Sequence, residues 1–119
     1  MKDINRIYHN SIGITFTWNF DNSRNGKKIQ LVFLNLSMCL STKKIEKFLK
    51  TIKRLQNEIA NDKSNNKKEN CESYLLETPS KDTCIVITYT ELETLKDLLE
   101  GALFGYSMNN LLRINMINK

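Results

Sequence analysis

Four basic residues recur at helical spacing in one stretch of the chain and form its most suggestive chemical pattern. They are Lys43, Lys47, Lys50 and Arg54, and we call them the basic stripe. Residues three and four positions apart are neighbours on a helix surface, so the stripe falls on one helical face. Such a face is typical of proteins that meet nucleic acid or another polyanion, although lysine-rich faces also serve simply as solvated surface.

Nucleic-acid binding through the basic helix 43–54 is therefore one functional hypothesis, and it is the second of two. The chain carries a net charge of +5, which favours contact with phosphates. The face of the stripe lacks aromatic and amide side chains that would stack on bases or read their edges. The sequence also lacks helix-turn-helix spacing, zinc-finger spacing and the strand motif of RNA-binding sheets.

The second predicted helix has the opposite charge, which suggests self-association. Its acidic residues Glu93, Asp97 and Glu100 share a face with Phe104 in a helical projection. In a homodimer, this acidic face of one chain would meet the basic stripe of the other. Exposed aromatic residues are enriched at protein interfaces. The alternative is that the C-terminal tail covers Phe104, because a single exposed aromatic residue is not a patch.

Cysteine and histidine residues give little support for a metal site. The four candidates are His9, Cys39, Cys71 and Cys84. They lack the paired spacing with which one turn supplies two ligands to a tetrahedral metal, so we predict no metal and no other cofactor. Cys39 and Cys84 lie in predicted strands, and we expect both to be buried as small hydrophobic side chains.

The sequence contains no recognisable catalytic motif either. His9 is the only histidine, no motif places a nucleophile beside it, and the four glycines are too scattered to form a phosphate-binding loop. Glu46 and Glu93 are a candidate carboxylate pair, but acidic residues in the first turn of a helix are expected from the helix dipole. We therefore predict that the protein is not an enzyme.

Length and composition indicate one domain over residues 1–119. The 119 residues can bury one hydrophobic core, and 40% hydrophobic with 26% charged residues is typical of a folded domain rather than a disordered chain. No apolar run has the length of a signal peptide or a membrane span. An odd number of scattered cysteines also differs from a disulfide framework. We therefore expect a cytosolic protein that does not bind membranes.

The first predicted half covers about residues 12–60 and begins with two strands. The first strand has apolar side chains at every second position, and this face is expected to meet the core. These side chains are Ile12, Ile14, Phe16, Trp18 and Phe20. An Asn-Gly pair at residues 25–26 favours a hairpin turn into a second strand over residues 28–40. The early part of that strand is apolar on both faces, which indicates either a bulge near residues 31–33 or a central place in the sheet.

Two amphipathic helices follow strands that end at a hydroxyl residue. Ser41 is the predicted N-cap of the basic helix, and Thr88 with Glu91 forms a predicted capping box for the second. The apolar side chains of each helix recur at helical spacing and form one stripe. A polar loop over residues 61–72 joins the first half to the second, which covers about residues 73–112.

The second half repeats the arrangement with shorter strands over residues 74–77 and 84–87. Gly101 and Gly105 in its helix lower helix propensity, but they also permit a close packing contact. The tail over residues 107–119 remains apolar at several positions. It either prolongs the helix or docks separately.

A shift of the sequence by 47 positions aligns the two halves. Six residues of the first half match residues of similar type in the second; they are Leu40, Ser41, Ile45, Glu46, Phe48 and Ile52, against Ile87, Thr88, Leu92, Glu93, Leu95 and Leu99. Each half then has one apolar sheet face and one apolar helix stripe, and neither can bury them alone. We therefore predict an α+β fold in which an antiparallel sheet of about four strands packs two helices on one face, as a ββα-ββα pseudo-repeat.

The stretch over residues 34–103 resembles a family of small uncharacterised bacterial proteins. The resemblance comes from Leu-Ser-Met-Cys-Leu-Ser before the first helix, and from Glu-Thr-Pro followed by Thr-Tyr-Thr-Glu-Leu-Glu-Thr-Leu in the second half. It implies no activity and no functional residue. The leading hypothesis is thus a small cytosolic binding or adaptor protein without catalysis, which binds an unknown protein partner or a second copy of itself.

Overall fold

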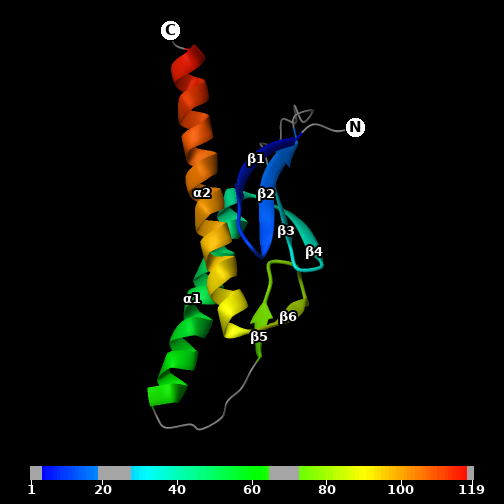
Figure 1. Ribbon diagram of the computed structural model, residues 1–119, viewed down its shortest axis with the longest axis vertical. Helices are drawn as coiled ribbons and strands as arrows, with labels where there is room; N and C mark the ends of the chain where they lie inside the picture. The colour runs from blue at the N-terminus through cyan, green and yellow to red at the C-terminus, as the bar shows by residue number, and fades with distance from the viewer. Residues whose placement is uncertain (1–3, 19–27, 65–72, 118–119) are drawn as a thin grey trace.

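The computed structural model of the chain describes residues 4–18, 28–64 and 73–117 (Figure 1). Within these ranges the order of elements is β1 (Ile4–His9), β2 (Gly13–Trp18), β3 (Ile29–Phe33), β4 (Leu36–Leu40), α1 (Thr42–Ser64), β5 (Tyr74–Glu77), β6 (Cys84–Ile87) and α2 (Tyr89–Ile117). The predicted turn at residues 25–26, Phe20 and Cys71 lie outside the described residues.

The described residues form two antiparallel sheets and two helices, which is the predicted α+β class. The larger sheet has the strand order β1-β2-β3-β4, and β5 pairs with β6 in a separate two-stranded sheet. Both helices lie along one side of the strands in Figure 1. The four-stranded antiparallel sheet with two helices on one face was predicted, but all four strands come from residues 4–40. The expectation that strands of both halves share one sheet is not met.

The predicted strand over residues 28–40 is two strands, because the chain reverses at Leu34 and Asn35. The two strands, β3 and β4, pair antiparallel along their whole length. Leu34 holds the turn with a φ of 52°, a left-handed conformation that is uncommon for a leucine. β3 does lie centrally in the sheet. The run of apolar residues looked apolar on both faces because it continues through the turn between β3 and β4. Glycine or asparagine usually marks such a turn, so a leucine conceals this one.

β1 lies before the first predicted half and completes the sheet. It pairs antiparallel with β2, and a bulge between Arg6 and Tyr8 inserts Ile7. The first helix is therefore preceded by four strands and the second by two, so the ββα-ββα pseudo-repeat is not confirmed. The similarity between the halves is local, since each helix follows a strand that ends at a hydroxyl cap.

Both predicted helix caps are confirmed. Ser41 Oγ accepts a hydrogen bond from the main-chain N–H of Lys44 (3.3 Å) at the start of α1. At the start of α2, Thr88 Oγ1 accepts from the N–H of Glu91 (3.1 Å), while the Glu91 carboxylate accepts from the N–H of Thr88 (3.0 Å). These bonds satisfy donors that a helix end leaves open. The C-terminal tail prolongs α2 to Ile117.

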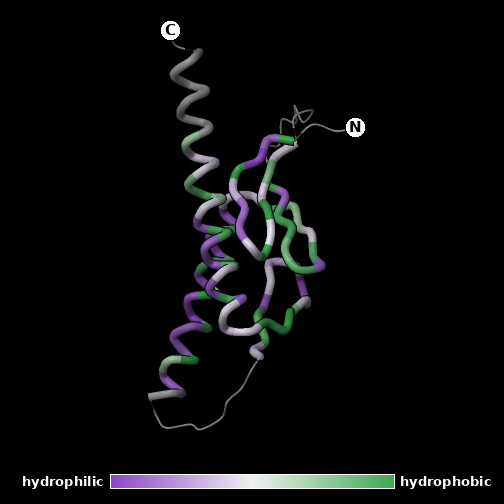
Figure 2. Tube along the Cα trace, viewed as in Figure 1, coloured by the Kyte–Doolittle hydropathy of each residue, from purple (hydrophilic) through white to green (hydrophobic). Residues whose placement is uncertain are grey.

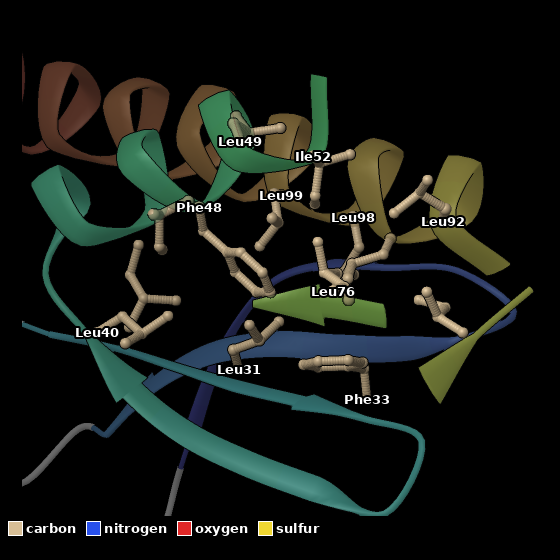
Figure 3. Packing of buried hydrophobic residues seen from close by; sticks show 14 of the residues in the cluster. Leu31, Phe33, Leu40, Phe48, Leu49, Ile52, Leu76, Leu92, Leu98 and Leu99 are labelled. Atoms are coloured by element: carbon tan, nitrogen blue, oxygen red, sulfur yellow. The ribbon is translucent and has the colours of Figure 1, made fainter. Parts of the chain in front are cut away.

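The hydrophobic core lies between the helices and the strands, as Figure 3 shows. β3 contributes three fully buried side chains, and α1 and α2 contribute their apolar stripes; the largest of these residues are Ile29, Leu31, Phe33, Ile45, Phe48, Ile52, Leu92, Leu95, Leu98 and Leu99. The rings of Phe33 and Phe48 lie 6.4 Å apart and tilted by 49°, so they join the sheet to α1. Figure 2, which colours the chain trace by hydropathy, shows hydrophilic residues along much of α1.

Ile12, just before β2, packs against the core as predicted, but β2 itself turns its apolar side chains away from it, contrary to the prediction. Thr15, which lies opposite Leu31, is fully buried and donates from Oγ1 to the main-chain carbonyl of Tyr8 (3.1 Å). Phe16 and Trp18 do not belong to the core cluster that the helices cover. The alternation of β2 was thus predicted correctly. The small polar side chains of β2 face the core, because β3 and the helices already fill the core with large apolar side chains.

The two described cysteines are exposed, so the expectation that they are buried is wrong. Cys39 precedes the buried Leu40 in β4, and Cys84 lies opposite the exposed Glu77 in the β5–β6 hairpin. Neighbouring residues of a strand point to opposite faces, so each cysteine occupies the solvent face. The general tendency of cysteine to be buried did not indicate which face of its strand each cysteine occupies.

Gly101 and Gly105 permit the close packing contact that the sequence suggested. A methyl group added at Gly101 would lie 2.5 Å from Cγ of Tyr8, and one added at Gly105 would lie 2.7 Å from a methyl group of Ile7. Both contacts are shorter than van der Waals separation. The two glycines therefore let β1 cross directly over α2.

Candidate functional site

Two adjoining hollows lie between α1 and the β5–β6 hairpin, and we call them together the α1–hairpin groove. Their volumes are about 280 Å³ and about 240 Å³, and both are lined by Thr51 and Glu77. The α1 wall consists of Lys44, Lys47, Phe48, Thr51, Arg54, Leu55 and Glu58. The hairpin wall consists of Leu75, Leu76, Glu77, Thr78, Pro79 and Cys84.

The groove follows α1 because its lining residues recur three and four positions apart. From Lys44 to Glu58 they cover about four turns of helix, or roughly 21 Å at 1.5 Å per residue. Phe48 and Leu76 are buried side chains at the base of the groove, whereas its charged residues are exposed. The groove thus has an apolar base and a polar rim, which is the usual anatomy of a protein-binding surface.

An apolar pair lies on the hairpin face beside the groove. Leu75 of β5 and Val86 of β6 are directly opposite each other, and each is 66% exposed. The alternate residues Leu76 and Ile87 are 1% exposed and face the core. Because strand side chains alternate, the pair and Glu77 belong to the same outward face. Leu75 also lines the groove, so the apolar pair and the groove form one continuous surface.

Charges of both signs border the groove. Arg54 and Glu77 approach to 3.6 Å across it, with side chains that are 63% and 73% exposed. An ion pair this exposed contributes little to stability. Lys44 and Lys47 lie towards the N-terminal end of α1, while Glu58 lies towards the other end. A bound segment could therefore exchange partners with the Arg54–Glu77 pair at small cost.

The structure places all four residues of the basic stripe on the exposed surface of α1, as the sequence indicated. Two of them, Lys47 and Arg54, line the groove. Lys43 and Lys50 are exposed outside it. The stripe is thus divided between the rim of the groove and the open face of α1.

Phe104 is the most exposed large hydrophobic residue of the described structure, at 70%. Met108, one helical turn further along α2, is 41% exposed. Phe104 does not line the groove, and no described part of the chain covers it. It remains a separate candidate contact, with Glu93, Asp97 and Glu100 exposed on the same helix.

A polar network attaches the β1–β2 hairpin to α2. The Asp97 carboxylate accepts hydrogen bonds from the Tyr8 hydroxyl (2.8 Å) and the Asn10 amide (2.9 Å), and Asn10 also donates to the carbonyl of Thr94 (2.9 Å). The hydrogen bond to Asp97, followed by desolvation and the charge of Asp97, raises the pKa of Tyr8 above its usual value of 10.0. The raised pKa keeps the hydroxyl a hydrogen-bond donor further into the alkaline range than in an unperturbed tyrosine.

The described residues contain no group of three potential ligands that could hold a metal ion. Of the predicted candidates, His9, Cys39 and Cys84 are each exposed and lie on different strands. Within the same ranges, neither helix combines the length and the hydropathy that crossing a membrane requires.

The model of a protein family matches residues 8–118 of the chain. That family is described as a family of unknown function, DUF6686. The chain belongs to the DUF6686 family. The match includes the whole α1–hairpin groove and extends on both sides of residues 34–103, where the sequence resembled an uncharacterised family. No curated protein and no solved structure matches the chain. Since DUF6686 has no described activity, function has to be inferred from the surface of the fold.

Sequence reasoning missed Leu75 and Val86, although a signal was present. Both predicted strands have adjacent apolar residues, Leu75 beside Leu76 and Val86 beside Ile87. A two-stranded hairpin has one buried face, so one member of each adjacent pair must face solvent. The alternation therefore predicts an exposed apolar pair once the hairpin is recognised.

Proposed function

We propose that this chain is a binding or adaptor protein without catalytic activity, which docks a protein partner in the α1–hairpin groove. The observation that supports this proposal is the exposed pair Leu75 and Val86 beside a groove with an apolar base. Burying apolar surface contributes about 25 cal/mol of favourable free energy per Å². Two large apolar side chains that stay side by side in solvent do not obtain this contribution. A partner that covers the pair recovers that free energy.

The chemistry of the groove specifies the kind of partner segment that fits. Apolar side chains of the partner would pack on Leu75 and Val86, and an acidic residue would meet Lys44 and Lys47 at one end. An apolar centre with charged surroundings is typical of protein interfaces. We place this activity in the cytoplasm, because Cys39 and Cys84 are free thiols, as is usual in a reducing compartment.

The double variant Leu75→Ser/Val86→Ser should lose the partner while keeping its fold, because both side chains are mostly exposed. Affinity purification from the native lysate with quantitative mass spectrometry would compare wild type with this variant. The proposal expects at least one protein to be depleted about tenfold or more, and titration calorimetry with that purified protein should reproduce the loss. Met108→Ser is the control, since it removes an exposed apolar residue outside the groove. Equal recovery of every protein by wild type and the double variant would contradict the proposal.

Self-association is a separate candidate function, with a second copy of the chain as the partner and Phe104 rather than Leu75 and Val86 as the apolar contact. Phe104 and the acidic residues of α2 would meet the basic stripe of α1 in the other copy. Multi-angle light scattering at micromolar concentration should then give a dimer for wild type and a monomer for Phe104→Ser. High salt should also weaken the dimer, because salt screens the paired charges. A monomer for both proteins would end the self-association proposal and leave a different protein as partner.

Nucleic-acid binding through α1 is the alternative function. Its support is that Lys43, Lys47 and Lys50 are all exposed on one helix face. The variant Lys43→Gln/Lys47→Gln/Lys50→Gln removes three positive charges from that face and leaves the core untouched. If α1 is the nucleic-acid surface, this variant abolishes the salt-dependent binding of oligonucleotides.

A further inference from the structure

The four-stranded sheet has a second face, which points away from α1 and α2. Register and alternation assign ten described strand residues to it, and we call them the outer sheet face. They are Ile4, Arg6, His9, Ile14, Phe16, Trp18, Gln30, Val32, Ser37 and Cys39. The exposed Lys28 lies two residues before Gln30 and continues the alternation of β3. In the described residues, neither helix contributes to this face.

The charge of the outer sheet face has a single sign. Arg6 and Lys28 are exposed on it. None of the described residues assigned to the face is acidic, although the chain has 13 acidic residues in all. A surface that carries basic but no acidic side chains attracts polyanions. It also repels basic proteins more than acidic ones.

Aromatic side chains lie at the centre of this basic surface. The rings of Phe16 and Trp18 meet edge to face, with centroids 5.1 Å apart and planes at 83°. Phe16 lies directly opposite Arg6 on one side and Gln30 on the other. Phe16 is nearly covered, whereas Trp18 is partly exposed.

A chain of hydrogen bonds fixes the central side chains across three strands. Trp18 Nε1 donates to Gln30 Oε1 (3.3 Å), and Gln30 Nε2 donates to Ser37 Oγ (2.7 Å). The indole ring and the amide are therefore held in defined orientations before any ligand arrives. Side chains that are already oriented lose less conformational entropy when a ligand binds, which reduces the free-energy cost of binding.

We propose that the outer sheet face binds single-stranded nucleic acid. A base stacks on Trp18, phosphates contact Arg6 and Lys28, and Gln30 and Ser37 offer hydrogen bonds to base edges. Single-stranded nucleic acid is favoured because it supplies both an exposed π-face and negative charge, which stacking platforms use together. This proposal is independent of the α1–hairpin groove and uses a different surface from the basic stripe.

Trp18 makes the proposal directly testable, because it is the only tryptophan of the chain. Titration with an oligothymidylate of about ten nucleotides, a length within known site sizes, should quench its fluorescence saturably. Two phosphate contacts predict that log K falls with log salt at a slope of about −1.4, so affinity drops roughly sevenfold between 50 and 200 mM salt. A duplex of the same length should bind more weakly, since its bases are already stacked.

Matched variants locate the binding surface. In anisotropy measurements with a labelled oligonucleotide, Trp18→Leu should weaken binding about tenfold. Arg6→Gln and Lys28→Gln are exposed changes that leave the core intact, and each should reduce the salt slope by about 0.7. The triple variant of Lys43, Lys47 and Lys50 should bind as wild type does, and circular dichroism confirms that each variant is folded.

Three results would overturn the proposal. The first is that fluorescence does not change up to high micromolar oligonucleotide. The second is that binding is lost in the α1 triple variant but retained by Arg6→Gln and Lys28→Gln. The third is that polyglutamate quenches Trp18 equally well, because a peptide without bases would then satisfy the site and the ligand would be an acidic protein.

Discussion

Replacing Phe33 by alanine should lower the free energy of unfolding by about 3–5 kcal/mol, because the removed ring leaves a cavity in the core. Phe33 is 1% exposed and packs against Phe48, so the change removes a ring contact between the sheet and α1. A domain of this size has a total stability of about 5–15 kcal/mol. Urea unfolding followed by circular dichroism should therefore show a large fall in the midpoint with an unchanged m-value.

Val32→Ala is the matched control for this prediction. Val32 neighbours Phe33 in β3, but it is half-buried on the outer sheet face and does not belong to the core cluster. Its truncation should cost less than about 1.5 kcal/mol. If the two variants lost similar free energies of unfolding, both faces of the sheet would have to be covered equally. That result would contradict the arrangement in which the helices cover one face.

Replacing Gly101 by alanine should destabilise the protein by about 1–2 kcal/mol, although the same change usually stabilises a helix by about 1 kcal/mol. The sign reverses because the added methyl group would lie 2.5 Å from Cγ of Tyr8, near the base of the side chain, where it cannot rotate away. Overpacking costs about 1–3 kcal/mol. Because the added methyl group would meet three ring atoms of Tyr8, we expect a cost in the upper part of that range, so that a net loss of about 1–2 kcal/mol remains after the helix gain. Thermal and urea unfolding of the single variant measure the net effect.

A double-mutant cycle separates the clash from other effects of the substitution. In a Tyr8→Ala background the ring is absent, so Gly101→Ala should regain its usual stabilising effect. The coupling free energy between the two positions is then about 2 kcal/mol or more, within the range for residues in direct contact. Additive effects of the two changes would show that β1 does not cross α2 at Gly101.

The parts of the fold that depend on neighbouring residues could be predicted from the sequence. The caps at Ser41 and Thr88 form within one helical turn, and the sequence contains both hydrogen-bonding partners of each. The apolar stripes and the exposure of the basic stripe follow from helical periodicity in the same way. Each of these features depends on residues at most a few positions apart.

Features that depend on the backbone course or on distant partners were not predictable. The turn at Leu34 lacks the residues that usually mark a positive φ, so two strands resembled one. The inward face of β2 was decided by which side chains β3 and the helices bring, not by β2 itself. In the candidate site, Arg54 was recognised as exposed, but its ion pair with Glu77 depends on how the hairpin docks beside α1.

The placement of the sheet in the first third of the chain has a consequence for synthesis on the ribosome. All four strands of the larger sheet are available once residue 40 has emerged, whereas α2, which packs against β1 and β2, is the last element to appear. The Tyr8–Asp97 hydrogen bond spans 89 residues. α1 can cover part of the apolar side of the nascent meander once it has emerged, but the part that α2 covers stays exposed until α2 follows. Transiently exposed apolar surface of this kind favours aggregation during folding.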